Sequence, residues 1–161
     1  MSCGVRPALV LGVGNLYRRD DGAGVRVAHA LRAAIQAGTT SLPGDTEVID
    51  GGTAGLDLLA VLPGTDRLVI VDALTPAGRP GAVSILRGPD LFATDGLAGA
   101  MDVLLATADL AGVLPREVTV VGIEAADTGD GDTLTPDVEA AIATATAAVV
   151  AQLAGQGGTT P

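Results

Sequence analysis

The sequence predicts an α/β fold, a three-layer α/β/α domain with a mixed, mostly parallel five-stranded sheet. Three observations predict it. The length of 161 residues fits one domain. Apolar residues make up 48% of the chain, enough for a core of Val, Leu, Ile and Ala, because it has only one Tyr and one Phe. Strand-like and helix-like segments alternate, as in a parallel sheet covered by helices. We expect residues 1–161 to form a single domain, with 1–6 and 155–161 disordered.

Five segments are predicted to be strands. Apolar runs typical of strands buried on both faces occupy residues 8–13, 46–49, 68–71 and 118–122. The segment 82–86 follows the third of these strands too closely for a crossover helix. Parallel neighbours need a connection of about a dozen residues. We therefore expect residues 82–86 to form an antiparallel strand.

Four segments are predicted to be helices, at residues 24–36, 56–62 and 99–111 and from Pro136 onward. In the first, Ile35 falls on the apolar face and His29 on the polar face. The last begins with Thr135 as a suitable N-cap and Pro136 at the first helical position. Its apolar stripe comprises Val138, Ile142, Ala145, Val149 and Leu153.

The charge and the cysteine content limit the possible partners. A net charge of −10 argues against nucleic acid and anionic membranes, which favour Lys and Arg. The single cysteine, Cys3, excludes a disulfide framework. We find no signal pattern near the start, and the apolar runs are shorter than the roughly 20 residues that a membrane span needs. We expect a cytoplasmic protein.

Several common chemistries lack their residues. No serine lies in a G-x-S-x-G motif, and Cys3 falls in the terminal segment. The one histidine, His29, lies between two arginines on its helix face and is expected to be a solvated surface residue. Residues 127–132 carry three aspartates without the spacing of a calcium loop, which favours a solvated loop.

A nucleotide site is a weak alternative. Residues 12–15 (GVGN) follow the first strand, and Asp50 ends the second strand, where a ribose-binding acid could stand. Tyr17 occupies the place of the third glycine, however, and Asp20-Asp21 would repel a pyrophosphate at the helix start.

Three acids remain at the predicted carboxyl edge of the sheet, where open α/β sheets bind ligands. Asp20 and Asp21 precede the first helix, and Asp72 follows the third apolar run. One acid before a helix is explained as an N-cap, and the second is not. Asp72 could serve its loop alone by accepting hydrogen bonds from backbone amides.

At this point the motifs resemble a known family. Residues 9–15 (LVLGVGN) and 20–25 (DDGAGV) are similar to the opening signature of the hydrogenase maturation proteases, which trim the large-subunit precursor of nickel–iron hydrogenases. The resemblance continues through residues 50–56 (DGGTAGL), 71–73 (VDA) and 80–81 (PG). It ends with residues 121–122 (VG) and 134–136 (LTP) at the last helix. It covers about residues 8–153, and several spaced motifs in one order make it specific.

The resemblance implies an endopeptidase that removes the C-terminal extension of a nickel-loaded [NiFe] hydrogenase large-subunit precursor. The nickel is carried by that precursor. By motif position, Asp21 and Asp72 are the expected catalytic and metal-binding acids. Asn15, Gly51 and Gly52 are the expected substrate-binding residues.

The family's metal-binding histidine does not carry over, because its position falls near Gly96. Imidazole is a natural nickel ligand, and the neighbouring Asp95 could supply an oxygen instead. Two alternatives therefore stay open. One is a non-catalytic relative that binds the precursor or an assembly factor, and the other is a nucleotide-binding module.

Overall fold

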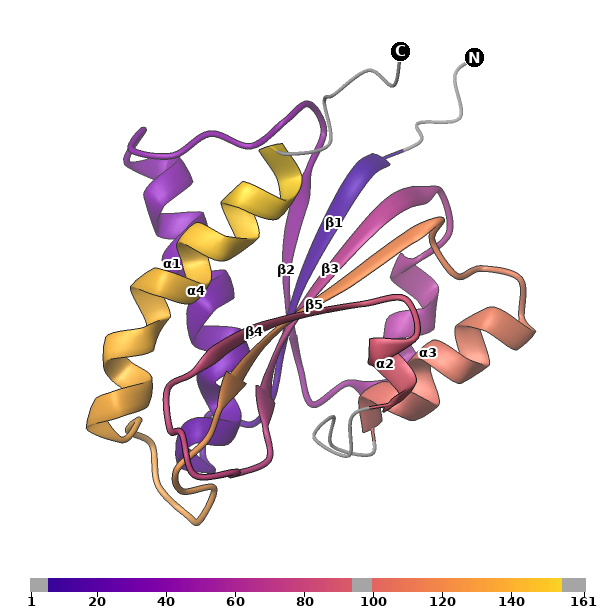
Figure 1. The fold of residues 1–161 in the computed structure, drawn as a ribbon. Helices are drawn as coiled ribbons and strands as arrows, with labels where there is room; N and C mark the ends of the chain where they lie inside the picture. Colours follow the sequence, from indigo (N-terminus) through magenta and orange to yellow (C-terminus); the bar gives the residue numbers. More distant parts are fainter. Residues whose placement is uncertain (1–5, 94–99, 155–161) are drawn as a thin grey trace.

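The computed structural model describes residues 6–93 and 100–154 (Figure 1). Its sheet has five strands in the order β2-β1-β3-β5-β4. The neighbouring pairs β2–β1, β1–β3 and β3–β5 are parallel, and β4 runs antiparallel to β5. The strands are β1 Arg6–Val13, β2 Glu47–Gly52, β3 Thr65–Leu74, β4 Val83–Arg87 and β5 Glu117–Glu124. The mixed, mostly parallel five-stranded sheet is thus confirmed, including the antiparallel strand.

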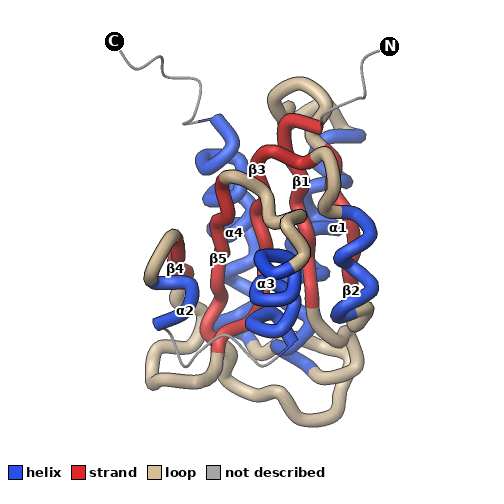
Figure 2. The backbone as a smooth tube through the Cα atoms, turned by 90° about the vertical axis from the view of Figure 1, so that its right-hand side faces the viewer, coloured by secondary structure: helices blue, strands red, loops and turns tan. Residues whose placement is uncertain are grey.

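Helices cover both faces of this sheet. Helices α1 (Ala23–Gln36) and α4 (Pro136–Ala154) pack on one face. Helix α3 (Ala100–Leu110) and the 3-10 helix η2 (Gly55–Val61) cover the other, and Figure 2 shows α3 lying across it. The short helices η1 (Arg19–Gly22) and α2 (Asp90–Ala93) complete the described chain. The three-layer arrangement is therefore confirmed.

The details correct several predictions. Arg6 already belongs to β1, although residues 1–6 were expected to be disordered. Residues 56–62 were expected to form a helix, and η2 there is a 3-10 helix ending at Val61. Ile35 is 38% exposed, since it lies in the last turn of α1, beyond the buried part of that helix. The predicted disorder of residues 1–5 and 155–161, and the positions of Asp95 and Gly96, lie outside the described residues.

Helix α4 is long and apolar enough, by length and composition alone, to cross a membrane. That test is weak evidence, because a core helix of a globular domain also passes it. The side of α4 that carries Val138, Ala145 and Leu153 is buried in one core with α1 and the sheet. Helix α4 therefore packs as a core helix of this domain.

Two features bring the carboxyl ends of the neighbouring strands and the start of α1 close together. In the strand register, Gly12 of β1 pairs with Asp50 of β2 and with Val71 of β3. A Cβ atom on Gly24 would collide with the carbonyl oxygens of Val13 and Val71. Helix α1 therefore begins in close contact with the ends of β1 and β3, which brings the preceding residues of η1 to the same edge.

Candidate active site

The loops at the carboxyl edge of the sheet enclose a small pocket of about 170 Å³. Both acids predicted to form the site line it, although they lie on different elements. Asp21 comes from η1, and Asp72 comes from β3. The lining residues are Val13, Gly14, Asp21, Gly52, Thr53, Gly55, Leu58, Asp72 and Met101.

Asp72 is a buried carboxyl group inside strand β3, rather than the first residue of a loop. Its side chain is 7% exposed, and its Oδ1 accepts a hydrogen bond from the N–H of Ala73 at 2.8 Å. Burial raises the pKa of Asp72; the Ala73 N–H lowers it and the nearby charge of Asp21 raises it, and together they bring it to about 7. Near neutral pH, Asp72 can therefore both hold and release a proton.

Asp21 is the more exposed partner of the pair. Its Oδ2 accepts a hydrogen bond from the N–H of Asn15 at 2.9 Å. Asn15 therefore holds the carboxylate through its backbone, while its side-chain Oδ1 accepts the N–H of Tyr17 at 2.9 Å. These bonds fix the loop between β1 and η1 around Asp21.

Asp20 has a different role from its neighbour. It is fully buried and accepts hydrogen bonds from the N–H groups of Ala126, Asp127 and Thr135 and from the Thr135 hydroxyl. Burial alone would raise the pKa of Asp20, but these donors lower it below its ordinary value. Asp20 joins η1 to the loop between β5 and α4, and it does not cap α1.

A second pocket of about 290 Å³ adjoins the first, because both are lined by Gly14, Gly52 and Thr53. The second pocket also includes Asn15 and Asp50. Two of the three residues predicted to bind substrate, Asn15 and Gly52, therefore line this second pocket. The third, Gly51, is buried behind the wall and lines neither of these pockets.

His29 is half exposed, but it is more than a solvated surface residue. Its Nε2 lies 2.7 Å from Oδ2 of Asp50. The other oxygen of Asp50 accepts the N–H of Gly52 at 3.0 Å, and the carbonyl of Gly52 accepts the N–H of Gly14 at 2.9 Å. A chain of hydrogen bonds thus runs from α1 through the end of β2 to the wall shared by the two pockets.

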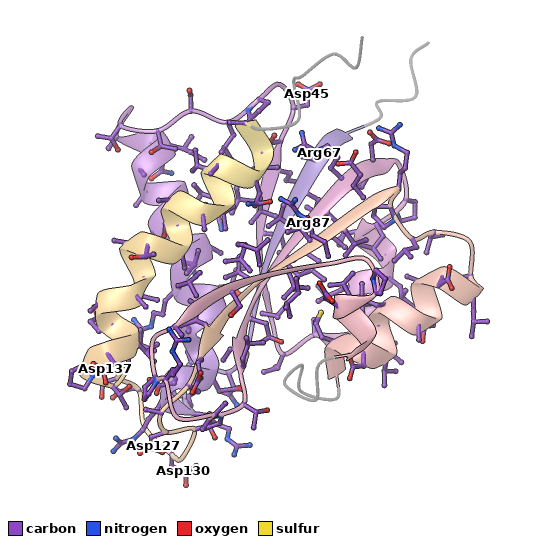
Figure 3. The ribbon with its side chains drawn as sticks, in the orientation of Figure 1. Asp45, Arg67, Arg87, Asp127, Asp130 and Asp137 are labelled. Atoms are coloured by element: carbon purple, nitrogen blue, oxygen red, sulfur yellow. The ribbon has the colours of Figure 1, made fainter. Side chains whose placement is uncertain are left out.

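The acidic loop at residues 127–132 is exposed at its tip, as Figure 3 shows for Asp127 and Asp130. The loop is nevertheless held to η1. The Arg19 guanidinium lies 3.4 Å from the Asp127 carboxylate and donates to the Asp130 carbonyl. This contact gives the Asp127 side chain a structural role in a loop that lacks calcium-binding spacing.

Within the described ranges 6–93 and 100–154, no three His, Cys, Asp or Glu residues are grouped to hold a metal ion. The pocket offers two carboxyl groups instead, and the buried one, Asp72, is partly protonated near neutral pH. A cation entering there would displace that proton and balance both charges. The two carboxylates are thus oxygen donors that suit a cation.

Sequence patterns missed two contributors to the site. Met101 lines the pocket from the first turn of α3. Glu124 is buried at the end of β5, and its Oε1 accepts the N–H groups of Ala77 and Arg79, which shapes the loop after Asp72. An acid shortly after the last predicted strand was the sequence signal available for Glu124. Periodicity placed Met101 on a helix without indicating what that helix faces.

The fold and the pocket define an α/β protein in which two carboxylate side chains, Asp21 and Asp72, line one pocket at the carboxyl edge of the sheet. The chain belongs to the hydrogenase maturation protease family, whose pattern it matches over residues 25–152. It is 37% identical over 155 residues to the hydrogenase 2 maturation protease of Escherichia coli, covering 90% of this chain and 89% of that protein. It is also 35% identical to the hydrogenase expression/formation protein HupD of Rhodobacter capsulatus, covering 90% of this chain and 70% of that protein.

Solved structures agree with this assignment. The hydrogenase maturating endopeptidase HybD from E. coli superposes with a TM-score of 0.81 at 35% identity, covering 94% of each chain. The [NiFe] hydrogenase maturation protease HybD from Thermococcus kodakarensis superposes with a TM-score of 0.73 at 27% identity, covering 91% of this chain and 99% of that chain.

Proposed function

We propose that this protein is an endopeptidase that removes the C-terminal extension of a nickel-loaded large-subunit precursor of a [NiFe] hydrogenase. Membership of the maturation protease family supports the class of reaction. The observation that carries the proposal is the pocket itself, which Asp21 and Asp72 both line and in which the pKa of Asp72 is raised, chiefly by burial, to about 7.

The surroundings of the two acids suit them to different roles. Asp21, held by the Asn15 N–H, supplies oxygen donors toward the nickel of the precursor. Asp72 in its ionised form takes a proton from water as the water oxygen attacks the peptide carbonyl carbon. Asp72 then passes that proton to the nitrogen of the leaving amine as the C–N bond breaks. A group whose pKa lies near the working pH is suited to both proton transfers.

The wall between the two pockets supplies the binding surface. Gly14, Gly52 and Thr53 line both compartments, and a substrate chain crossing this wall would bring one peptide bond to the acids. We propose that Asn15, Gly51 and Gly52 form the backbone of this surface. Gly51 is buried and lines neither pocket, so it would support this surface from beneath.

The decisive test is cleavage of a nickel-loaded precursor, followed by mass spectrometry of the shortened product. Asp21→Asn and Asp72→Asn should each lower the rate roughly 100-fold or more, the usual loss when a proton-transfer group is removed. Asp66→Asn is the matched control, since Asp66 also lies on β3 but pairs with Arg116 at 3.0 Å, away from the pocket. Failure of the parent to cleave under any metal condition would refute the proposal.

A non-catalytic relative that binds the precursor, or an assembly factor, is the second candidate. One sequence observation favours it, because Gly96 stands where the family has its metal-binding histidine. Stable binding of the precursor without a shortened product would select it.

The third candidate, a nucleotide-binding module, has less support. The N–H of Asp20 donates to the Asp127 carbonyl and that of Asp21 donates to the Arg18 carbonyl, so neither amide faces a phosphate. Titration with NAD, FAD and ATP should give no binding.

The same proposal includes the location and the partners. We propose a cytoplasmic protein whose partner is the precursor, with no nucleic acid or membrane partner. The net charge of −10 supports this, because both of those partners favour basic surfaces. Fractionation of cells that express the chain tests the location.

A further inference from the structure

Two carboxylates alone do not determine which cation the pocket prefers, so the identity of a third ligand matters. Carboxylates are hard donors that suit Mg²⁺, Ca²⁺ or Mn²⁺ as well as nickel. Among the described residues that line the pocket, Thr53 and Met101 also carry a side-chain donor atom, a hydroxyl oxygen and a thioether sulfur. Thr53 is exposed, whereas Met101 is only 3% exposed.

Met101 reaches this pocket from a separate layer of the protein. Asp21 belongs to η1 on the α1 side, Asp72 belongs to the central strand β3, and Met101 belongs to α3 on the opposite face. Donors from three elements therefore surround one volume of about 170 Å³.

A purely structural Met101 would need no sulfur. The side chain packs in the core cluster with Leu58, Leu104 and Leu105, and leucine fills such positions equally well. Methionine differs from leucine by a polarisable thioether, which soft and borderline cations accept as a ligand. Its presence beside two carboxylates is the observation that points to a ligand role.

We propose that the Met101 thioether is a third ligand, together with Asp21 and Asp72, for the cation that this pocket receives. The pocket then prefers Ni²⁺ and Cu⁺ over Mg²⁺. The inference rests on the proposed function in that the cation arrives with the precursor, but the free ions are sufficient to test it.

The central variant is Met101→Leu, which removes the sulfur at nearly equal volume. Parent and variant both carry Cys3→Ser, so that the one thiol of the chain cannot bind the soft ions. Affinities for Ni²⁺, Cu⁺ and Mg²⁺ are measured by titration against competing chelators. We expect Met101→Leu to lower the affinity for Ni²⁺ and Cu⁺ about tenfold or more and to leave the affinity for Mg²⁺ unchanged. Tenfold is the smaller end of the loss seen when a residue that only supports a metal ligand is mutated.

A matched control keeps the sulfur but moves it. The double variant Met101→Leu/Leu104→Met has the same composition, and Leu104 is buried on α3 without lining the pocket. It should bind ions as Met101→Leu does. X-ray absorption of the nickel-bound parent should show one sulfur neighbour, and both variants should show none. Thermal melting checks that all three proteins are folded.

The outcomes separate this inference from the proposed function. Equal Ni²⁺ and Cu⁺ affinities in the parent and in Met101→Leu, or a nickel site with no sulfur neighbour, would overturn the role of Met101. If Asp72→Asn abolishes binding in that case, the acid pair still holds the cation and the proposed function stands. If Asp21→Asn and Asp72→Asn leave the affinities unchanged, the pocket is not the metal site and both ideas fail.

Discussion

Asp20 accepts two hydrogen bonds from Thr135, one from its N–H and one from its hydroxyl, both at 2.8 Å and across 115 positions of sequence. The next residue, Asp21, faces the pocket instead. Two adjacent acids of the same type therefore have opposite roles, one inside the structure and one at the site. This difference gives a direct test of the assignment.

Asp20→Asn should destabilise the protein by roughly 3 kcal/mol. The Asn amide has only one acceptor oxygen, so at least one buried N–H is left facing an NH₂ group, which costs about 1–3 kcal/mol beyond the weakened remaining bonds. The free energy of unfolding from urea titration gives the value.

Asp21→Asn is the matched variant and should change stability by less than about 1 kcal/mol, because its carboxylate accepts one N–H from the described part of the chain. An equal loss in both variants would show that Asp21 is a structural residue as well.

Asp72 should make stability fall as pH rises. Its pKa is raised from 3.8 to about 7 in the folded protein. Between those values the folded state holds a proton that the unfolded state has lost, so the free energy of unfolding falls with pH and then levels off above about 7.

Asp72→Asn should remove this dependence. At pH 8 the variant should be more stable than the parent by up to about 4 kcal/mol, since one pKa unit is worth about 1.4 kcal/mol. Near pH 4 the two should match. Urea unfolding at both pH values measures the difference, with Asp66→Asn as the control. A variant that is less stable at pH 8 would mean that the ionised carboxylate stabilises the fold through the Ala73 N–H.

His29 should influence binding more than stability. The His29–Asp50 pair is largely exposed, and such pairs contribute about 0–1 kcal/mol to folding. Because Asp50 also holds the Gly52 N–H, loss of the imidazole should loosen the wall between the two pockets. We expect His29→Ala to weaken precursor binding about two- to fivefold, which corresponds to 1 kcal/mol or less.

Two variants control the His29 experiment. His29→Gln keeps a nitrogen donor near the position of Nε2 and should restore binding. Arg32→Ala changes an exposed residue of the same helix and should have no effect. A loss in His29→Ala that glutamine does not restore would assign the effect to the helix surface instead. The dissociation constant for the precursor, measured beside the melting temperature, gives the comparison.

The sequence predicted the sheet well because each strand is a local apolar run. The central strands were placed to within a few residues, and the antiparallel β4 followed from its short connection. The acids at the carboxyl edge followed from the same topology. The division between Asp20 and Asp21 did not, because it depends on donors at residues 126–135, more than a hundred positions away.

Side-chain contacts between different layers of the fold could not be predicted from the sequence either. Periodicity correctly put His29 on the polar face of α1, but it could not show that the end of β2 lies beside that face. The helical pattern placed Met101 on α3, but nothing in the sequence indicated that α3 borders the pocket. Glu124 was passed over because its partners, Ala77 and Arg79, are backbone amides.

The last prediction concerns Gly96, near which the motif resemblance places the histidine expected of the family. Gly96→His should raise the affinity for Ni²⁺, because an added imidazole shifts a carboxylate site toward nickel and copper. It should also raise the cleavage rate if the parent turns over slowly. Calorimetric titration with Ni²⁺, at matched pH and with folding checked by melting, measures the change.

Combining this change with the loss of the sulfur shows whether the two donors are alternatives. If imidazole and thioether bind the same ion, Gly96→His/Met101→Leu should recover the nickel affinity that Met101→Leu alone loses. Its Cu⁺ affinity should stay below that of the parent but above that of Met101→Leu. Equal nickel affinities in the parent and in a folded Gly96→His would contradict the family's metal site at Asp21 and Asp72. The non-catalytic relative would then be the better account of this chain.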